Sequence, residues 1–288
     1  MAARAFISGL SGLTLTAAER AFLREAKPWG LILFARNIQS DEQIIRLIDE
    51  SSDVLGTQAP VLIDQEGGKV QRIKPPLVPR EYPTGAAYGR LYDLDRARGL
   101  AAARLGGRLI ASDLHRLRIS VDCLPVADVP VGGAHDVIGD RAYGRTPAKV
   151  SALAAAAAEG LQDGGVLPVL KHIPGHGRAT ADSHEELPRV DADRATLEVT
   201  DFAAFRPLNR LPLGMTAHVK FTAIDPVQPA TTSATMIRDV IRGFIGFDGL
   251  LMSDDVCMEA LTGTIAARTR AALAAGCDLA LHCSGRID

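Results

Sequence analysis

The residues best suited to chemistry in this sequence gather in one short segment rich in histidine and glycine. The segment from Lys171 to His184 reads KHIPGHGRATADSH. Asp182 precedes His184 by two residues, so in an extended loop its carboxylate can contact the imidazole, fix the tautomer and stabilise the imidazolium. The spacing predicts a general acid/base unit, although an isolated Asp-x-His triplet is also typical of an ordinary surface loop.

A metal site is a competing interpretation of the same segment. His172 and His176 are separated by three residues, as in helical zinc motifs. The proline and two glycines within Pro174–Gly177 exclude that helix. A zinc site in a loop, formed by His172, His176 and His184, stays open. Cysteine ligands and a HExxH pattern are absent from the segment, and we expect neither a metal nor another cofactor.

Asp254 is the expected nucleophile. Ser183 and Ser253 are competing nucleophiles, but neither serine lies in a GxSxG sequence, and two acidic residues follow Ser253 at once. Asp254 comes directly after the apolar run Leu250–Met252 and Ser253. A carboxylate at the end of a buried strand is held rigidly, and carboxylates attack glycosidic carbons readily.

If the carboxylate attacks a glycosidic carbon, the substrate is a sugar. Its hydroxyl groups then need binding partners, and long or bidentate polar side chains supply them. The candidates are Asp64, Arg72, Arg141 and Lys171. Aromatic residues make up 5% of the chain, with Trp29 as the single tryptophan. A long aromatic groove for a polymeric sugar is therefore not expected, and a pocket for one terminal sugar fits better.

Eight short apolar runs alternate with seven amphipathic stretches along the chain, which favours a parallel sheet with crossover helices. The predicted strands are Ala5–Leu10, Gly30–Arg36, Val61–Glu66, Ile119–Val126, Val166–Ile173, Leu213–Val219, Leu250–Asp254 and Cys277–Cys283. The predicted helices are Thr16–Ala26, Asp41–Leu55, Leu94–Leu117, Pro147–Gln162, Arg194–Leu211, Thr232–Phe244 and Ile265–Ala275.

An eightfold repeat in a chain near the usual length of roughly 250 residues predicts an α/β fold of the TIM-type (β/α)8 barrel class, formed by residues 1–288 as a single domain. An open doubly wound sheet is the alternative, but no GxGxxG follows the first strand. The helix expected after the last strand is missing, because only Ser284–Asp288 remain. We expect either a truncated chain or another element over that strand.

The barrel interpretation explains where the polar residues fall. Strand ends of a parallel barrel converge on one mouth, and the predicted strands end in Asp64 with Gln65 and Glu66, Lys171 with His172, His218, Asp254 with Asp255, and His282. Any one of these could simply mark a strand entering solvent. Their number favours a shared site.

Composition narrows the class of protein. A net charge of −2 without long charged runs argues against a nucleic-acid partner. No apolar run approaches the roughly 20 residues of a membrane helix, and glycines and serines interrupt the N-terminal apolar stretch, so no signal peptide is predicted. The four cysteines form no CxxC pair and are expected to be reduced thiols. We expect a cytoplasmic protein, as a monomer.

Five motifs carry a family resemblance. In order, IDQEGGKVQRI, IGDRAYG, KHIPGHGRATADSH, MTAH and MSDD are similar to the bacterial β-N-acetylhexosaminidases of glycoside hydrolase family 3. The nearest type is the single-domain enzyme of peptidoglycan recycling. The resemblance extends from GLILFARNI to GCDLALHC. Ile173 departs from it, because phenylalanine is common there.

The resemblance implies roles for particular residues. His184 would be the general acid/base oriented by Asp182, and Asp254 the nucleophile. Five residues match positions that bind the terminal N-acetylglucosamine, namely Asp64, Arg72, Arg141, Lys171 and His172. The implied substrates are N-acetylglucosaminyl-anhydromuramyl peptides, cleaved in the cytoplasm with retention and without a metal. A phosphorylase of the same family, a β-glucosidase and a non-catalytic sugar-binding relative remain alternatives.

Overall fold

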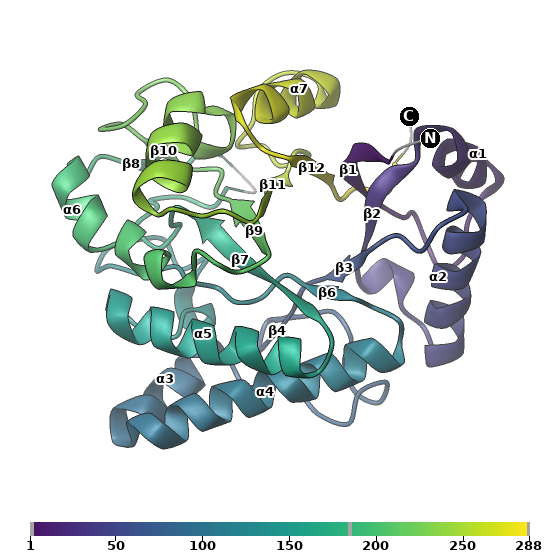
Figure 1. Cartoon of the computed structure of the whole chain (residues 1–288), viewed down its shortest axis with the longest axis horizontal. Helices are drawn as coiled ribbons and strands as arrows, with labels where there is room; N and C mark the ends of the chain where they lie inside the picture. Colours follow the sequence, from purple (N-terminus) through teal and green to yellow (C-terminus); the bar gives the residue numbers. More distant parts are fainter. Residues whose placement is uncertain (1–2, 184–185, 287–288) are drawn as a thin grey trace.

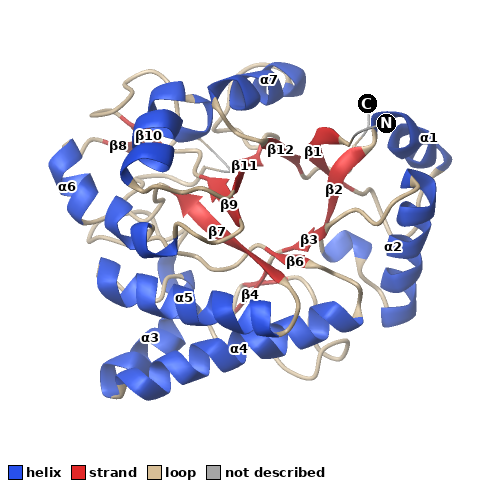
Figure 2. Cartoon of the chain, viewed as in Figure 1, coloured by secondary structure: helices blue, strands red, loops and turns tan. Residues whose placement is uncertain are grey.

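The chain folds into a closed barrel of eight parallel strands surrounded by helices. The computed structural model describes residues 3–183 and 186–286, and Figures 1 and 2 show the strands as an inner ring with the helices outside it. The neighbours run in the order β1, β12, β11, β9, β7, β6, β3, β2. Their bounds are β1 Arg4–Gly9, β2 Pro28–Leu33, β3 Val61–Ile63, β6 Val121–Asp122, β7 Leu167–Ile173, β9 Leu213–Thr216, β11 Leu250–Asp255 and β12 Leu279–His282. The predicted (β/α)8 barrel is confirmed.

Most of the main helices begin and end close to the residues that the sequence indicates. They are α1 Ala17–Ala26, α2 Asp41–Leu55, α3 Gly85–Leu94, α4 Arg96–Arg116, α5 Pro147–Asp163, α6 Arg194–Val199, the π-helix η6 Met236–Phe244 and α7 Ile265–Ala275. Thr16 and Glu19 form a capping box at the start of α1. Gly56 and Gly276 end α2 and α7 in the left-handed conformation, which glycine adopts without strain.

One predicted helix is wrong in extent, and one helix lies outside the predicted set. The stretch 94–117 forms α4, which starts at Arg96 because Asp95 leaves the helical conformation and caps the helix by accepting a hydrogen bond from the Arg98 N–H. The helix before it, α3, is not among the predicted helices. The stretch 194–211 is helical only as far as Val199. Thr200 then adopts φ −118° and ψ −84°, and short 3-10 turns follow, with Pro207 unable to donate a backbone hydrogen bond.

The third predicted strand is also wrong in extent, and this difference affects the site. The barrel strand β3 ends at Ile63, and β4 Gln65–Gly67 pairs antiparallel with β5 Val70–Gln71. Gly67 at the end of β4 and Gly68 in the turn that follows have φ values of +102° and +57°, which residues other than glycine rarely adopt. Glu66 therefore lies on a hairpin next to the barrel, rather than on a barrel strand.

The interior of the barrel is filled with apolar side chains. Ile7, Leu62, Val121, Val169 and Met252 are fully buried and belong to one cluster. The four cysteines are free thiols, of which Cys123 and Cys277 are buried. No helix follows β12 among the described residues. None of the helices in residues 3–183 and 186–286 is long and apolar enough to cross a membrane.

Helices α4 and α5 approach each other closely through glycines. A Cβ atom at Gly107 would lie 2.3 Å from the Ala157 carbonyl oxygen, and one at Gly160 would lie 2.0 Å from the Arg104 carbonyl oxygen. Real Cβ atoms do not approach backbone oxygen this closely, so the two helices would have to move apart.

Gly107→Ala is expected to lower the free energy of unfolding by about 2 kcal/mol, because a methyl group in a filled interface forces backbone shifts. Urea denaturation measures this difference. Gly12→Ala is the control, since a Cβ at Gly12 meets nothing within 4 Å. Equal stability of the two variants would mean that the α4–α5 contact tolerates the extra methyl group.

Candidate active site

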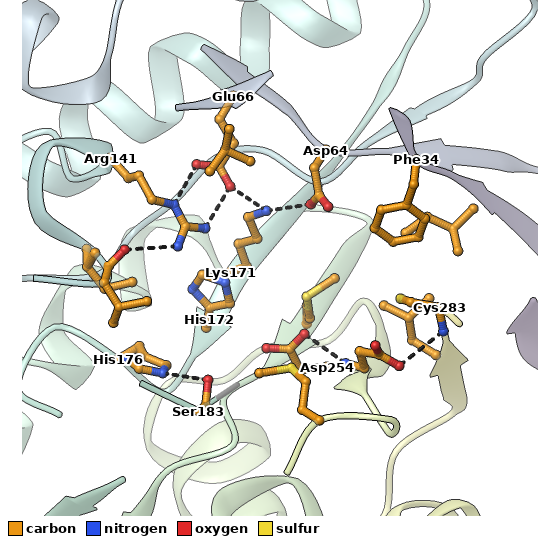
Figure 3. Close-up of a pocket in the computed structure, with 18 of the residues that line it drawn as sticks. Phe34, Asp64, Glu66, Arg141, Lys171, His172, His176, Ser183, Asp254 and Cys283 are labelled. Atoms are coloured by element: carbon orange, nitrogen blue, oxygen red, sulfur yellow. Dashed lines mark hydrogen bonds and ion pairs between the residues drawn. The ribbon is translucent and has the colours of Figure 1, made fainter. Parts of the chain in front are cut away.

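A cavity of about 160 Å³ opens where the carboxyl ends of the barrel strands meet. Figure 3 shows its polar side chains pointing toward one another. Asp64 follows β3, Lys171 and His172 end β7, and Asp254 lies in β11. Arg72 and Arg141 reach the cavity from the β5 hairpin and the 3-10 turn η2 Gly139–Arg141. The structure thus brings six of the eight sequence-predicted site residues around one cavity.

The other two predicted residues belong to the segment Asp182–His184. His184 lies outside the described residues. Asp182 is described but does not line the cavity, whereas its neighbour Ser183 does. The backbone carbonyl of Asp182 accepts a hydrogen bond from the Glu186 N–H.

A buried chain of alternating charges forms one wall of the cavity. The Lys171 Nζ atom lies 2.9 Å from Asp64 Oδ1 and 2.7 Å from Glu66 Oε1. Arg141 donates two hydrogen bonds to Glu66, from Nε at 2.9 Å and from Nη2 at 2.7 Å. Arg72 donates to Asp64 at 2.9 Å. Figure 3 shows Lys171 between the two carboxylates, so five side chains hold one another in place.

These contacts keep the whole wall ionised despite its burial. Burial by itself would raise the pKa of Glu66, but its ion pairs with Arg141 and Lys171 lower the value to about 2. Burial opposes the charged form of Asp64 too, yet Lys171 and Arg72 hold its pKa well below the usual range. Burial would lower the pKa of Lys171, whereas Asp64 and Glu66 raise it. The cavity therefore presents fixed positive hydrogen-bond donors.

Asp254 faces this wall from across the cavity (Figure 3). Its Oδ1 atom accepts a hydrogen bond from the Asp255 N–H at 2.8 Å. Burial acts to raise the pKa of Asp254, but this hydrogen bond and the positive charge of Lys171 act to lower it, and the pKa lies below the ordinary value. Asp254 is thus an ionised carboxylate, the state that its predicted role as nucleophile requires.

Asp255, the next residue, has a different role. Its Oδ1 atom accepts hydrogen bonds from the backbone N–H groups of Cys257 and Cys283 at 3.0 and 3.1 Å. Its carbonyl oxygen accepts a hydrogen bond from Nε2 of the buried His218 at 2.9 Å. These three hydrogen bonds fix the backbone next to Asp254. His218, which ends a predicted strand, therefore supports the site without lining the cavity.

A second buried network lies behind His172. The Asp128 Oδ2 atom is 2.7 Å from His172 Nδ1, and its Oδ1 atom accepts the His176 N–H at 2.6 Å. The His176 Nε2 atom is 3.1 Å from the Ser183 hydroxyl oxygen. Burial lowers the pKa of His176 to about 4, so this imidazole is neutral near pH 7.

Sequence reasoning noted Glu66 and His176 but gave neither a place among the site residues, and it missed Asp128 altogether. A signal for Asp128 exists, because it is the one charged residue in the apolar stretch from Cys123 to Val131. A charge within such a run is buried only if it has partners. Nothing in the local sequence identifies those partners.

Among the residues that the structure describes, no group of three histidine, cysteine, aspartate or glutamate side chains is arranged to hold a metal ion. The zinc site that the sequence leaves open includes His184, which lies outside the described residues. His172 and His176 instead contact each other edge to face, with ring centroids 5.8 Å apart.

Comparison with known proteins agrees with this architecture. The model of the glycosyl hydrolase family 3 N-terminal domain matches residues 8–288. A β-hexosaminidase of Alkalilimnicola ehrlichii is 41% identical over 280 residues, which cover 96% of this chain and 79% of that protein.

Two solved structures are similar over nearly the whole chain. NagZ from Neisseria gonorrhoeae in complex with N-trifluoroacetyl-D-glucosamine matches with a TM-score of 0.90 and 34% identity, covering 98% of this chain and 82% of that one. A family 3 β-N-acetylglucosaminidase from a Paenibacillus species matches with a TM-score of 0.87 and 32% identity, covering 96% of this chain and 53% of that one.

The ionised wall predicts a stability effect of Glu66 that depends on pH. Its pKa of about 2 in the folded chain lies below its ordinary value of 4.5. The ionised form therefore stabilises the fold above pH 4.5, and this contribution is lost as the pH falls toward 2. Glu66→Gln should lower the free energy of unfolding by about 3 kcal/mol at pH 7.

The difference between wild type and Glu66→Gln should shrink progressively between pH 5 and pH 2, since only the wild type has a carboxyl group at position 66 that takes up a proton there. Denaturant unfolding at several pH values measures it. A difference that stays constant over this range would contradict the proposed ionisation of Glu66.

Proposed function

The chain belongs to glycosyl hydrolase family 3 and is a glycoside hydrolase of the β-hexosaminidase type, and we propose that it is an exo-acting, retaining β-N-acetylglucosaminidase. It removes non-reducing terminal N-acetylglucosamine from anhydromuropeptides derived from the cell wall. The observation that carries this proposal is the cavity itself, in which the ionised Asp254 faces a wall of fixed charges built around Lys171.

The size of the cavity supports an exo-acting enzyme. Its volume of about 160 Å³ is that of a small pocket, which suits one terminal sugar unit better than a long polymer. Arg72, Arg141, Lys171, His172 and Asp64 are the proposed contacts to the hydroxyl groups of this unit. The Neisseria relative was solved with N-trifluoroacetyl-D-glucosamine, which supports the same sugar here.

In the first step, an Asp254 carboxylate oxygen attacks the anomeric carbon and the bond from that carbon to the leaving oxygen breaks. His184, oriented by Asp182, gives its proton to the leaving oxygen. The product is a glycosyl ester on Asp254. An imidazole suits this task, because its unperturbed pKa of about 6.5 permits both proton donation and acceptance near neutral pH.

In the second step, neutral His184 accepts a proton from water, and the water oxygen attacks the anomeric carbon. The ester bond breaks, and Asp254 leaves as a carboxylate. Two displacements at one carbon restore the original configuration, so the released sugar is the β-anomer. The charges around Lys171 keep their positions throughout, which avoids reorganisation during the reaction.

The leaving group is proposed to be an anhydromuramyl peptide, and the enzyme to act in the cytoplasm as a monomer. These finer points extend the resemblance noted in the sequence.

The substrate assignment predicts a clear preference. The protein should hydrolyse para-nitrophenyl N-acetyl-β-glucosaminide and leave the corresponding β-glucoside almost untouched, as measured by nitrophenol release. Comparable rates on both would contradict the specificity for N-acetylglucosamine. The assay is repeated in phosphate and in an inert buffer, because formation of sugar 1-phosphate would identify a phosphorylase instead.

The roles of the two reacting residues predict different kinetic losses. Asp254→Asn should abolish turnover, since an amide is not a nucleophile for this carbon. His184→Ala should slow substrates with poor leaving groups by about 100-fold or more, and activated aryl glycosides much less, because only the former need a proton. Steady-state rates on both substrate types provide the measurement. Equal losses on both would refute the acid role of His184.

A further inference from the structure

Asp128 connects His172, which lines the cavity, to the segment that precedes His184. It is 0% exposed and does not line the cavity. One of its oxygens contacts the His172 ring, and the other accepts the His176 backbone N–H. The His176 ring in turn contacts the Ser183 hydroxyl, as Figure 3 shows. A single buried carboxylate thus holds residues from β7 and from the loop after it.

The contact with Asp128 decides which nitrogen of His172 carries the proton. Burial acts to raise the pKa of Asp128, but the hydrogen bonds that it accepts from the His172 ring and the His176 backbone lower it, so Asp128 is a carboxylate and can only accept. The His172 Nδ1 atom, 2.7 Å away, must therefore be the N–H donor. In the neutral ring the other nitrogen, Nε2, is then a hydrogen-bond acceptor.

An acceptor on this side of the cavity has a specific value. Lys171, Arg141 and Arg72 are donors only, so each can donate a hydrogen bond to the oxygen of a sugar hydroxyl. The hydrogen of that hydroxyl needs a separate acceptor. Asp64 and Glu66 already form ion pairs with these cations. A neutral His172 Nε2 supplies a further acceptor, one that is uncharged and not engaged in an ion pair.

We propose that Asp128 is a positioning residue, which locks His172 in the Nδ1–H tautomer so that Nε2 accepts a hydrogen bond from a hydroxyl of the terminal sugar. This inference rests on the proposed function, because it assumes a sugar in the cavity. Asp128 acts on binding only through His172 and touches no substrate itself.

The substitution Asp128→Asn reverses this arrangement for a geometric reason. The His176 N–H requires an acceptor at the position of Asp128 Oδ1, 2.6 Å away. The asparagine carbonyl oxygen takes that position, so its NH2 group faces His172 Nδ1 and donates to it. The ring proton then moves to Nε2, which turns the acceptor toward the cavity into a donor.

The tautomer is measured directly by long-range ¹H–¹⁵N correlation spectra of the histidine rings. The His172 signals are assigned by their loss in His172→Gln. Wild type should show His172 protonated at Nδ1, and Asp128→Asn should show it protonated at Nε2. An Nε2–H tautomer in wild type, or an unchanged tautomer in the variant, would overturn the proposal. This result does not depend on turnover, so it stands apart from a failure of the proposed function.

Kinetics test the consequence for the sugar. For the full aryl substrate, Asp128→Asn should raise KM on the order of 10- to 100-fold, the loss typical of residues that orient a ligand-binding histidine. Aryl N-acetylglucosaminides that each lack the 3-, 4- or 6-hydroxyl are compared. One of them should show little further loss in the variant, since the hydroxyl that contacts His172 is already gone. Equal loss on every substrate would indicate general damage and overturn the proposal.

Glu19→Gln is the matched control. Glu19 is also a buried carboxylate that accepts backbone N–H groups, from Ser11 at 2.7 Å and Thr16 at 2.8 Å, but it caps helix α1. Its variant should lose stability while KM and the His172 tautomer stay at wild-type values. A change in that tautomer would show that any buried carboxylate affects it, which contradicts a specific role of Asp128.

Discussion

The ammonium group of Lys171 is buried in the barrel mouth, and a buried charge is tolerated only when opposite charges contact it directly. Its side chain is 3% exposed, and carboxylates from two separate elements lie within 3 Å of it. Asp64 follows a barrel strand, whereas Glu66 belongs to the β4–β5 hairpin. The hairpin and the turn that carries Arg141 must therefore close onto the barrel, and this closure forms the wall of the cavity.

The buried negative charge of Asp128 imposes a second requirement, since it too needs partners in direct contact. Asp128 is fully buried and is satisfied by an imidazole and a backbone N–H from the KHIPGHG sequence. The glycines of this sequence permit the close approach, because a Cβ atom at Gly177 would lie 2.3 Å from the Val129 backbone. The histidine loop is thus packed against the residues that follow β6, and its chemistry depends on that packing.

Together the two networks give the cavity two kinds of hydrogen-bonding wall. Cations of the Lys171 wall supply donors whose charge does not change near neutral pH, while the imidazoles beside Asp128 have a polarity that depends on the proton position. Asp254 lies opposite the wall and keeps a low pKa. A sugar hydroxyl needs both an acceptor and a donor, and a single type of wall would leave half of its hydrogen-bonding capacity unused.

The barrel itself could be predicted from the sequence, because the alternation of eight apolar strands with seven amphipathic helices is a local and repeated pattern. Motifs such as KHIPGHG and MSDD were also visible, and with them the residues Lys171, His172 and Asp254 at strand ends. The partners were not. Lys171 is 107 positions from Asp64, Arg141 is 75 from Glu66, and His172 is 44 from Asp128. Such pairs arise only when the barrel closes, since no local pattern indicates which distant charge will meet which. The tertiary structure alone therefore decided that Glu66 joins the wall from a hairpin and that Asp128 holds the histidines, because burial forces each charge to meet the partner that the fold brings to it.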